Sequence, residues 1–483
     1  MAACGLAALG AQADQIDQIA NTATGARAAT VAEISRLVGD GQWQAARTDI
    51  ADELQPTNLP FQTRQDLLFQ SDRMARMRLD FAKTRDQVFQ EAHAIVPTLT
   101  EKQFAAWEKA GAVEFLDVDG RRRYFNNAAG NLFRVNPEAG ALKDKFHPGA
   151  ASASLYRLED IRNVIAAYDK TGAAFNSPRT WRVTYTLSVK PDAVPPGEII
   201  RAWLPFPHAG NRQKNIRLLA ADPPRHVLSD TNAALASVYL EKPAVRGQAT
   251  QFKIVFEYTG DAFYRPLDPA RVTPVNTNDP ALAPFLGAEP PQIVFSDELQ
   301  ELSRQIVGDA TNPCVIARRL FAWSAQHVPW APAREYSTIA CLPRYALTHG
   351  HGDCGIKTMT FMTLCRLNGI PARWESGWTT DPIQDMHDWC EIYLAPYGWV
   401  PMDVTYGLTD SADAREKWFY FGGIDAGRLV VNTDYDQPLY PAKTFFRSEI
   451  VDFQRGEVEW RGGNLYFNQW NWNFQAKEIA ANR

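Results

Sequence analysis

Three residues in the second half of the chain combine side chains that suit nucleophilic chemistry. Cys354 lies in the sequence Gly352-Asp353-Cys354-Gly355, and His387 and Asp403 follow it within fifty residues. A thiol is a strong nucleophile once it loses its proton, an imidazole can accept that proton, and a carboxylate can orient the imidazole. These residue types, in this order, predict attack on a carbonyl carbon by the sulfur of Cys354.

Cys354 is expected at the start of a helix. Met359 and Leu367 belong to an apolar series spaced by three and four residues, and Asn368-Gly369 supplies the stop signal. The unpaired N–H groups of a helix N-terminus carry partial positive charge, which favours a thiolate over a thiol. The same groups can hold the oxyanion of a tetrahedral intermediate. The sequence therefore predicts an activated thiol at Cys354.

His387 and Asp403 are expected on neighbouring strands. Residues 387–393 alternate between two faces, the turn 396–398 follows, and residues 399–403 begin a second strand. Two strands joined by such a short turn pair antiparallel. The two side chains can then lie side by side, with Asp403 on one imidazole nitrogen and the other nitrogen free to face Cys354.

These motifs resemble the core of the transglutaminase-like superfamily, and the resemblance covers about residues 310–410. It rests on four segments in the family's order, namely Gly352-Asp353-Cys354, Gly369-Ile370-Pro371-Ala372-Arg373, His387-Asp388-Trp389-Cys390-Glu391 and Gly398-Trp399-Val400-Pro401-Met402-Asp403. The resemblance implies a papain-like core with a catalytic triad. In it Cys354 is the nucleophile, His387 the base and then the acid, and Asp403 the orienting group.

Aromatic residues near these motifs have two interpretations each. Family members often place an aromatic or amide side chain upstream of the cysteine to help the oxyanion hole, which makes Trp330 the candidate here; the alternative is a packing residue. Trp374, Trp378 and Trp389 line a substrate groove or belong to the core. The histidines His349 and His351 stand close to Cys354, but their spacing matches no recognised metal pattern, so neither a metal nor a cofactor is predicted.

The surrounding sequence predicts an α+β protein of several domains. Residues 14–175 are expected to be a mainly helical accessory region with a β-hairpin, because Asp119-Gly120 is a strong turn signal. Short alternating strands at 178–265 indicate a β-sandwich. Residues 292–445 are expected to form the transglutaminase-like catalytic core. Residues 446–483 are so aromatic that they should pack on the body of the protein.

The first residues, 1–13, read as the remnant of an export signal, because they are small and apolar and end in Ala11-Gln12-Ala13. They predict a periplasmic or secreted protein, and a cytoplasmic one if they are an ordinary Ala-rich terminus. Cys4 faintly suggests a lipid acceptor. In an oxidising compartment, Cys314 and Cys341 could pair.

Composition limits the partners. The 483 residues are 45% hydrophobic and 22% charged, with a net charge of −5 and no large basic block, which argues against nucleic acid. No apolar run is long enough to predict a transmembrane segment. A protein or peptide substrate is expected, with hydrolysis of a peptide or isopeptide bond through a thioester. The alternatives are glutamine–amine cross-linking, as in a transglutaminase-type acyltransferase, and a non-catalytic binding module of the same fold.

Overall fold

The computed structural model describes residues 30–148, 155–210, 212–230 and 233–480. The predicted export signal at 1–13 and Cys4 lie outside these residues. The described chain divides into two compact units, one of residues up to 109 together with 113–129, and one of residues 110–112 and those from 130 onward. Each unit has its own buried core.

The first unit is helical apart from one hairpin. Trp43, Leu67 and Met74 belong to its buried cluster. At the predicted turn, Asp119 and Gly120 adopt positive φ angles of 47° and 78°, which a tight antiparallel hairpin requires. The elements are a helix at 30–39, α2 (Trp43–Glu53), α3 (Phe61–Asp80), α4 (Arg85–Ile95), α5 (Glu101–Lys109), β1 (Phe115–Val118) and β2 (Arg121–Tyr124).

Three further helices follow, α6 (Ala128–Val135), α7 (Pro137–Phe146) and α8 (Leu158–Thr171). The sequence analysis assigned all residues from 14 to 175 to one accessory region. In the structure α8 belongs to the second unit, because its apolar face packs in that unit's largest core through Ile161, Val164 and Ile165.

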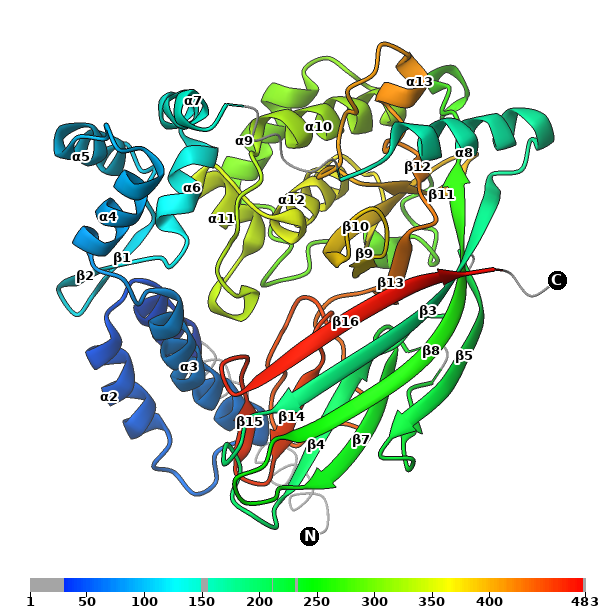
Figure 1. The fold of residues 1–483 in the computed structure, drawn as a ribbon. Helices are drawn as coiled ribbons and strands as arrows, with labels where there is room; N and C mark the ends of the chain where they lie inside the picture. The colour runs from blue at the N-terminus through cyan, green and yellow to red at the C-terminus, as the bar shows by residue number, and fades with distance from the viewer. Residues whose placement is uncertain (1–29, 149–154, 211, 231–232, 481–483) are drawn as a thin grey trace, which may run out of the picture. The chain divides into compact units, whose positions relative to one another are not determined.

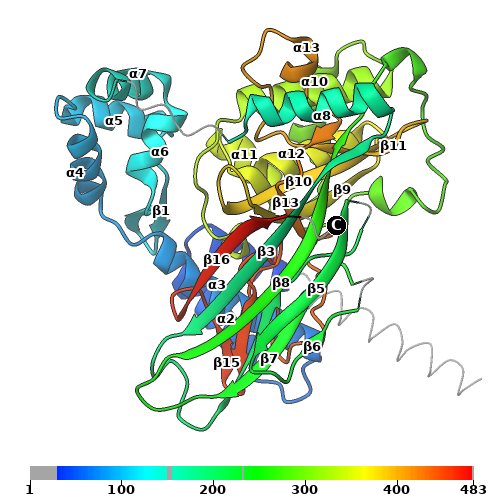
Figure 2. The ribbon, with the colours of Figure 1, turned by 45° about the vertical axis from the view of Figure 1, so that its right-hand side comes forward.

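The second unit contains two five-stranded sheets that share one apolar core. Strands run in the order β12-β8-β3-β16 in one sheet, with β5 also paired to β8, and β15-β14-β4-β7-β6 in the other. Figures 1 and 2 show the long strands β3 and β8 side by side, flanked by β16 and β5. The bounds are β3 (Phe175–Val189), β4 (Ile199–Pro205), β5 (Gln213–Asp222), β6 (Val227–Leu228), β7 (Ser237–Pro243), β8 (Thr250–Tyr264), β12 (Gly423–Ile424), β14 (Glu457–Trp460), β15 (Gly463–Leu465) and β16 (Trp470–Ile479).

The predicted sandwich range of 178–265 therefore takes in only part of these sheets. The aromatic C-terminal segment supplies β14, β15 and β16, and its Trp470 and Phe474 enter the shared core. Strand β16 pairs with β3 along ten residues, from Trp470 opposite Val189 to Ile479 opposite Thr180. Segments almost 300 residues apart in the sequence thus form one sheet, a pairing that local sequence patterns do not report.

The remaining elements form a four-stranded antiparallel sheet, in the order β11-β10-β9-β13, with helices around it. Helix α12 packs against β9 and β10, and nearly all of its residues are buried. The helices are α9 (Asp297–Val307), α10 (Pro313–His327), α11 (Leu342–His349), α12 (Cys354–Leu367) and α13 (Ala414–Lys417), with short 3₁₀ turns η1 (Pro269–Arg271), η2 (Ala283–Phe285) and η3 (Tyr336–Thr338). The strands are β9 (Ala372–Thr379), β10 (Asp385–Leu394), β11 (Gly398–Met402) and β13 (Arg428–Asn432).

Two observations concern the compartment. Among the described residues, no helix has the length and apolar character to cross a membrane. Cys314 and Cys341 are both free thiols, and the thiol of Cys341 donates to the carbonyl of Gln292 at 3.4 Å.

Candidate active site

Cys354 is the first residue of α12, as the sequence analysis predicted. Asp353 is the N-cap residue, and its carboxylate accepts a hydrogen bond from the amide of Ile356 at 3.3 Å. The hydroxyl of Tyr336 donates to Asp353 at 2.7 Å and accepts from the amide of Gly355 at 3.1 Å. A Cβ at position 355 would lie 2.3 Å from this hydroxyl, so glycine is required for the ring of Tyr336 to close the first turn.

The thiol of Cys354 donates a hydrogen bond to Oδ2 of Asp388 at 3.2 Å. Burial, and then the charges of Asp388 and Asp353, raise the pKa of this thiol. The direction of this shift is opposite to the one expected from the helix N-terminus. The partial charge of a helix end is only about half an elementary charge, and here it faces two carboxyl groups that oppose ionisation of the sulfur.

Asp388 is a partner of the thiol that the sequence did not predict. It is 1% exposed, and its Oδ1 accepts from the side-chain amide of Gln454 at 2.7 Å. Burial, followed by the nearby Asp452 and Asp353, raises the pKa of Asp388. The thiol and this carboxyl group are therefore coupled, because a negative charge on either one opposes ionisation of the other.

His387 and Asp403 meet at the other half of the predicted triad. The Nε2 atom of His387 lies 2.8 Å from Oδ2 of Asp403, and the imidazole ring packs on Tyr406 with ring centres 4.9 Å apart. The second oxygen of Asp403 accepts the amides of Thr405 and Tyr406, both at 3.0 Å. Burial alone would raise the pKa of Asp403, but the charges of His387 and Arg428 lower it. Asp403 is therefore an ionised, fully bonded acceptor.

Consecutive residues of β10 thus contact the two halves of the predicted triad. Asp388 contacts Cys354, and His387 contacts Asp403. In the described part of the chain no hydrogen bond joins Cys354 to His387, whose Nε2 is occupied by Asp403 and whose Nδ1 is the atom left for another partner. The antiparallel pairing of β10 with β11 predicted from the short turn is confirmed, with Cys390 opposite Met402.

Arg428, at the start of β13, is a buried cation that the sequence analysis missed. Its Nη1 donates to Oδ2 of Asp403 at 2.8 Å, and its Nη2 donates to Asp425 at 3.0 Å. One signal was available in the sequence. Residues 429–431 form an apolar run typical of a buried strand, so an arginine directly before it needed a buried carboxylate.

A cavity of about 240 Å³ opens beside Cys354. Trp330 lines it, is 40% exposed, and pairs with Gly352 as an isolated parallel bridge. The structure thus brings the predicted oxyanion residue to the cavity that holds the thiol, although Trp330 makes no contact there that assigns it this role. The charged residues of the lining are mostly acidic, namely Glu335, Asp353, Asp385, Asp388, Glu449 and Asp452, with Arg334 and Arg455.

The other three tryptophans proposed for a substrate groove lie in the core instead. Trp374 and Trp378 are each 1% exposed and Trp389 is completely buried, which leaves no surface for a substrate. Trp378 stacks on Phe474 of β16, with ring centres 4.2 Å apart. Their large apolar area stabilises the sheet, and the packing alternative considered for them holds.

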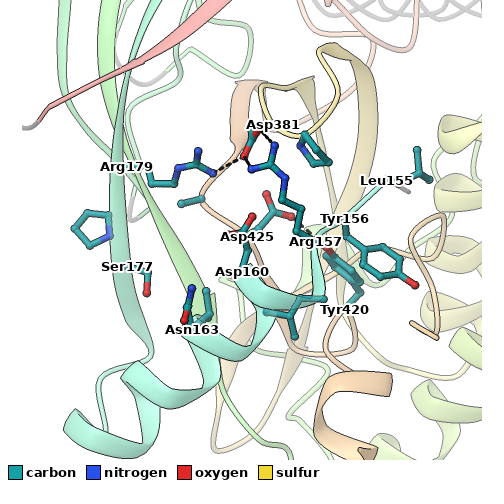
Figure 3. Close-up of a pocket in the computed structure, with 15 residues that line it drawn as sticks. Leu155, Tyr156, Arg157, Asp160, Asn163, Ser177, Arg179, Asp381, Tyr420 and Asp425 are labelled. Carbon is teal, nitrogen blue, oxygen red and sulfur yellow. Dashed lines mark hydrogen bonds and ion pairs between the residues drawn. The ribbon is translucent and has the colours of Figure 1, made fainter. Parts of the chain in front are cut away.

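A second cavity, of about 220 Å³, lies between α8, the start of β3 and the loop after β9 (Figure 3). Arg157 and Arg179 both bind Asp381 there, at 2.9 to 3.0 Å. Asp425, the partner of Arg428, is also on the wall of this cavity. Cys354 is not among the residues that line it. Among the described residues, no three His, Cys, Asp or Glu side chains are arranged to hold a metal ion.

Comparison with known proteins identifies one family, over the segment that holds Cys354, His387 and Asp403. Residues 300–404 match the family model of the transglutaminase-like superfamily. No curated protein matches the chain. Among solved structures, a candidate cysteine protease from Cytophaga hutchinsonii is 16% identical, with 64% of this chain and 93% of that chain covered and a TM-score of 0.43. The periplasmic domain of TgpA from Pseudomonas aeruginosa is 15% identical, with 53% and 94% covered and a TM-score of 0.24.

Proposed function

Starting from the transglutaminase-like domain that residues 300–404 of this chain form, we propose a thiol-dependent acyl-transfer enzyme that hydrolyses peptide or isopeptide bonds. The observation that carries the proposal is the 2.8 Å bond between His387 on β10 and Asp403, the residue directly after β11. It is the base-plus-orienter half of a nucleophilic triad, and the thiol stands beside a cavity that a substrate can enter.

Acylation begins with proton transfer in this proposal. Nδ1 of His387 takes the thiol proton, which requires Cys354 to give up its hydrogen bond to Asp388. The sulfur then bonds to the amide carbonyl carbon and the carbonyl electrons move onto oxygen. When the tetrahedral intermediate collapses, the C–N bond breaks and the imidazolium returns its proton to the leaving amine, which leaves a thioester on Cys354.

Deacylation uses the same residues in reverse. His387 removes a proton from water, the resulting hydroxide attacks the thioester carbonyl, and the carboxylic acid leaves as the sulfur regains the proton. Asp403 remains ionised throughout, because the positive charges of His387 and Arg428 lower its pKa. It keeps the ring in one orientation and stabilises the imidazolium.

Trp330, which lines the same cavity as Cys354, completes the proposed site. Together with the N–H groups at the start of α12, its indole N–H is the proposed donor to the oxyanion. The periplasmic or secreted location predicted from residues 1–13 stays a prediction, with a cytoplasmic location as its alternative.

A peptide library tests the reaction and the acceptor together. The protein is incubated with the library and a tagged primary amine, and products are identified by mass spectrometry. Cleaved peptides that disappear with Cys354→Ala support hydrolysis. Tagged but uncleaved glutamine peptides mean that an amine is the acceptor instead. If products form equally well with Cys354→Ala, the thiol is not the nucleophile and the proposal is wrong.

A further inference from the structure

Arg428 binds the same oxygen atom of Asp403 that His387 binds. The guanidinium Nη1 and the imidazole Nε2 each lie 2.8 Å from Oδ2. Arg428 is 3% exposed and Asp403 is completely buried, so neither charge is screened by water. Two donors on one carboxylate oxygen compete for its electron density, and a fixed cation next to an imidazole opposes protonation of the ring.

The other nitrogens of Arg428 fix its position. Nε and Nη2 donate to Oδ2 of Asp425 at 3.1 and 3.0 Å. The guanidinium carbon also lies 4.2 Å from the centre of the Tyr406 ring, which in turn packs on His387. Arginine has a planar fork that can bridge two carboxylates in this way, whereas lysine offers a single charged point.

We propose that Arg428 is a positioning residue of the active site, which acts through Asp403 to set the orientation and the protonation of His387. The inference rests on the proposed function for its consequence in catalysis. The electrostatic coupling between Arg428 and His387 can be measured without a substrate.

Other titratable groups also contribute to the electrostatic potential at Arg428 and Asp403. Asp425 faces Arg428 from the turn between β12 and β13, Tyr420 from the segment between α13 and β12, and Tyr406 from the loop after β11. Lys357 of α12 acts on Asp403 from the helix side. Burial lowers the pKa of Lys357 to about 8, so this second cation is still charged where imidazole titrates and loses its charge only at higher pH, whereas a guanidinium stays charged throughout. Arg428 therefore supplies the permanent positive charge.

Asp425 connects Arg428 to a cavity that is separate from the one beside Cys354. It is on the wall of the cavity of Figure 3, near Asp160 and Tyr420, while Asp403 and His387 are not part of that wall. Arg428 spans from this wall to the buried carboxylate. A change at Asp425 can therefore loosen Arg428 without altering Cys354, His387 or Asp403.

The test is an NMR titration of His387 in the full-length protein, in the unmodified chain and in four variants. Arg428→Met should raise the pKa of His387 by about one unit, because a cation close to the ring is lost. Arg428→Lys, which keeps the charge, should shift it less than half as much. Asp425→Asn, which preserves volume and keeps the cation but removes one of the two carboxylates that hold it, should shift the pKa measurably less than Arg428→Met.

Arg366→Met is the matched control, because Arg366 is also buried, lies in the same unit and binds Glu289 rather than Asp403. It should leave the pKa of His387 unchanged. The inference is overturned if Arg428→Met folds and its His387 titrates within 0.2 unit of the unmodified protein. If Arg428→Met does not fold, Arg428→Lys decides. An unshifted pKa of His387 with altered ¹⁵N shifts of its ring, which report the tautomer, supports a positioning role for Arg428. Unaltered ¹⁵N shifts overturn the inference. Absence of peptide cleavage would instead count against the proposed function.

Discussion

The thiol of Cys354 and the carboxyl group of Asp388 form a hydrogen bond of 3.2 Å at the start of α12. This contact favours the protonated thiol, because two adjacent acidic groups cannot both ionise without repulsion. In the proposed reaction the bond must break before the sulfur can attack. Asp388 therefore sets how much of the protein holds a reactive thiolate at a given pH.

Asp388→Asn should increase the reactivity of Cys354. An amide can still accept the thiol hydrogen bond but carries no charge, so the pKa of the thiol should fall. Alkylation of Cys354 by iodoacetamide at pH 7, followed by peptide mapping, should become roughly three to ten times faster. Asp385→Asn is the control, because Asp385 lines the same cavity without contacting the sulfur. Equal acceleration in both variants would mean that the general charge of the cavity, rather than the contact, matters.

Gly355→Ala should disrupt the first turn of α12. The added Cβ would lie 2.3 Å from the hydroxyl of Tyr336 and 2.7 Å from the ring carbon that bears it. Because this ring is buried, relief requires a backbone shift, and we expect a loss of about 2 kcal/mol or more in urea unfolding. Gly130→Ala, in a helix with open space around the Cβ, should be neutral or stabilising. Unchanged stability in Gly355→Ala would contradict the packing described for Tyr336.

Asp353→Asn should change how stability depends on pH. Burial raises the pKa of Asp353 to about 7, well above its value of about 3.9 in an unfolded chain. The folded protein thus binds the proton more tightly, and the stability from this group, complete below pH 4, is lost as the pH rises through 7. Asparagine keeps the N-cap without a charge. Urea unfolding at pH 5 and pH 8 should show a smaller decline in the variant, and an identical decline would refute the assignment.

Truncation of Trp378 should reduce mainly stability, and truncation of Trp330 mainly activity. Trp378→Ala removes a buried ring stacked on Phe474, which should cost about 3 to 5 kcal/mol of unfolding free energy. Trp330 is 40% exposed at the cavity of Cys354, so Trp330→Ala should cost less than about 1 kcal/mol and reduce turnover of any substrate found. Chemical denaturation together with the peptide assay separates the two effects. If Trp330→Ala is strongly destabilised, Trp330 is a packing residue rather than part of the oxyanion hole.

Local sequence patterns predicted the part of the site that local chemistry determines. Glycines and a capping aspartate before an apolar helical series put Cys354 at the start of α12, and a short turn put His387 and Asp403 on adjacent segments. The contacts of Arg428 with Asp403 and of Gln454 with His387 could not be predicted from the sequence. Both residues lie in later segments of the chain, and only the tertiary fold brings them to the site.

The pKa of Cys354 is shifted in the direction opposite to the prediction for a related reason. The helix N-terminus is visible in the sequence, but the burial of Asp388 and Asp353 beside the sulfur depends on how α12 and β10 pack. Likewise, the aromatic residues after 456 signalled packing, but their pairing as β16 with β3 depends on the tertiary fold.

Alkylation of Cys354 with and without its base tests the central claim most directly. Iodoacetamide needs no knowledge of the substrate, and Cys341, also partly exposed, serves as an internal control in every sample. We predict that His387→Ala slows the modification of Cys354 at pH 7.5 at least tenfold, while Cys341 reacts at its former rate. If Cys354 in His387→Ala reacts as fast as in the unmodified protein, His387 does not activate the thiol and the proposed catalytic triad is wrong.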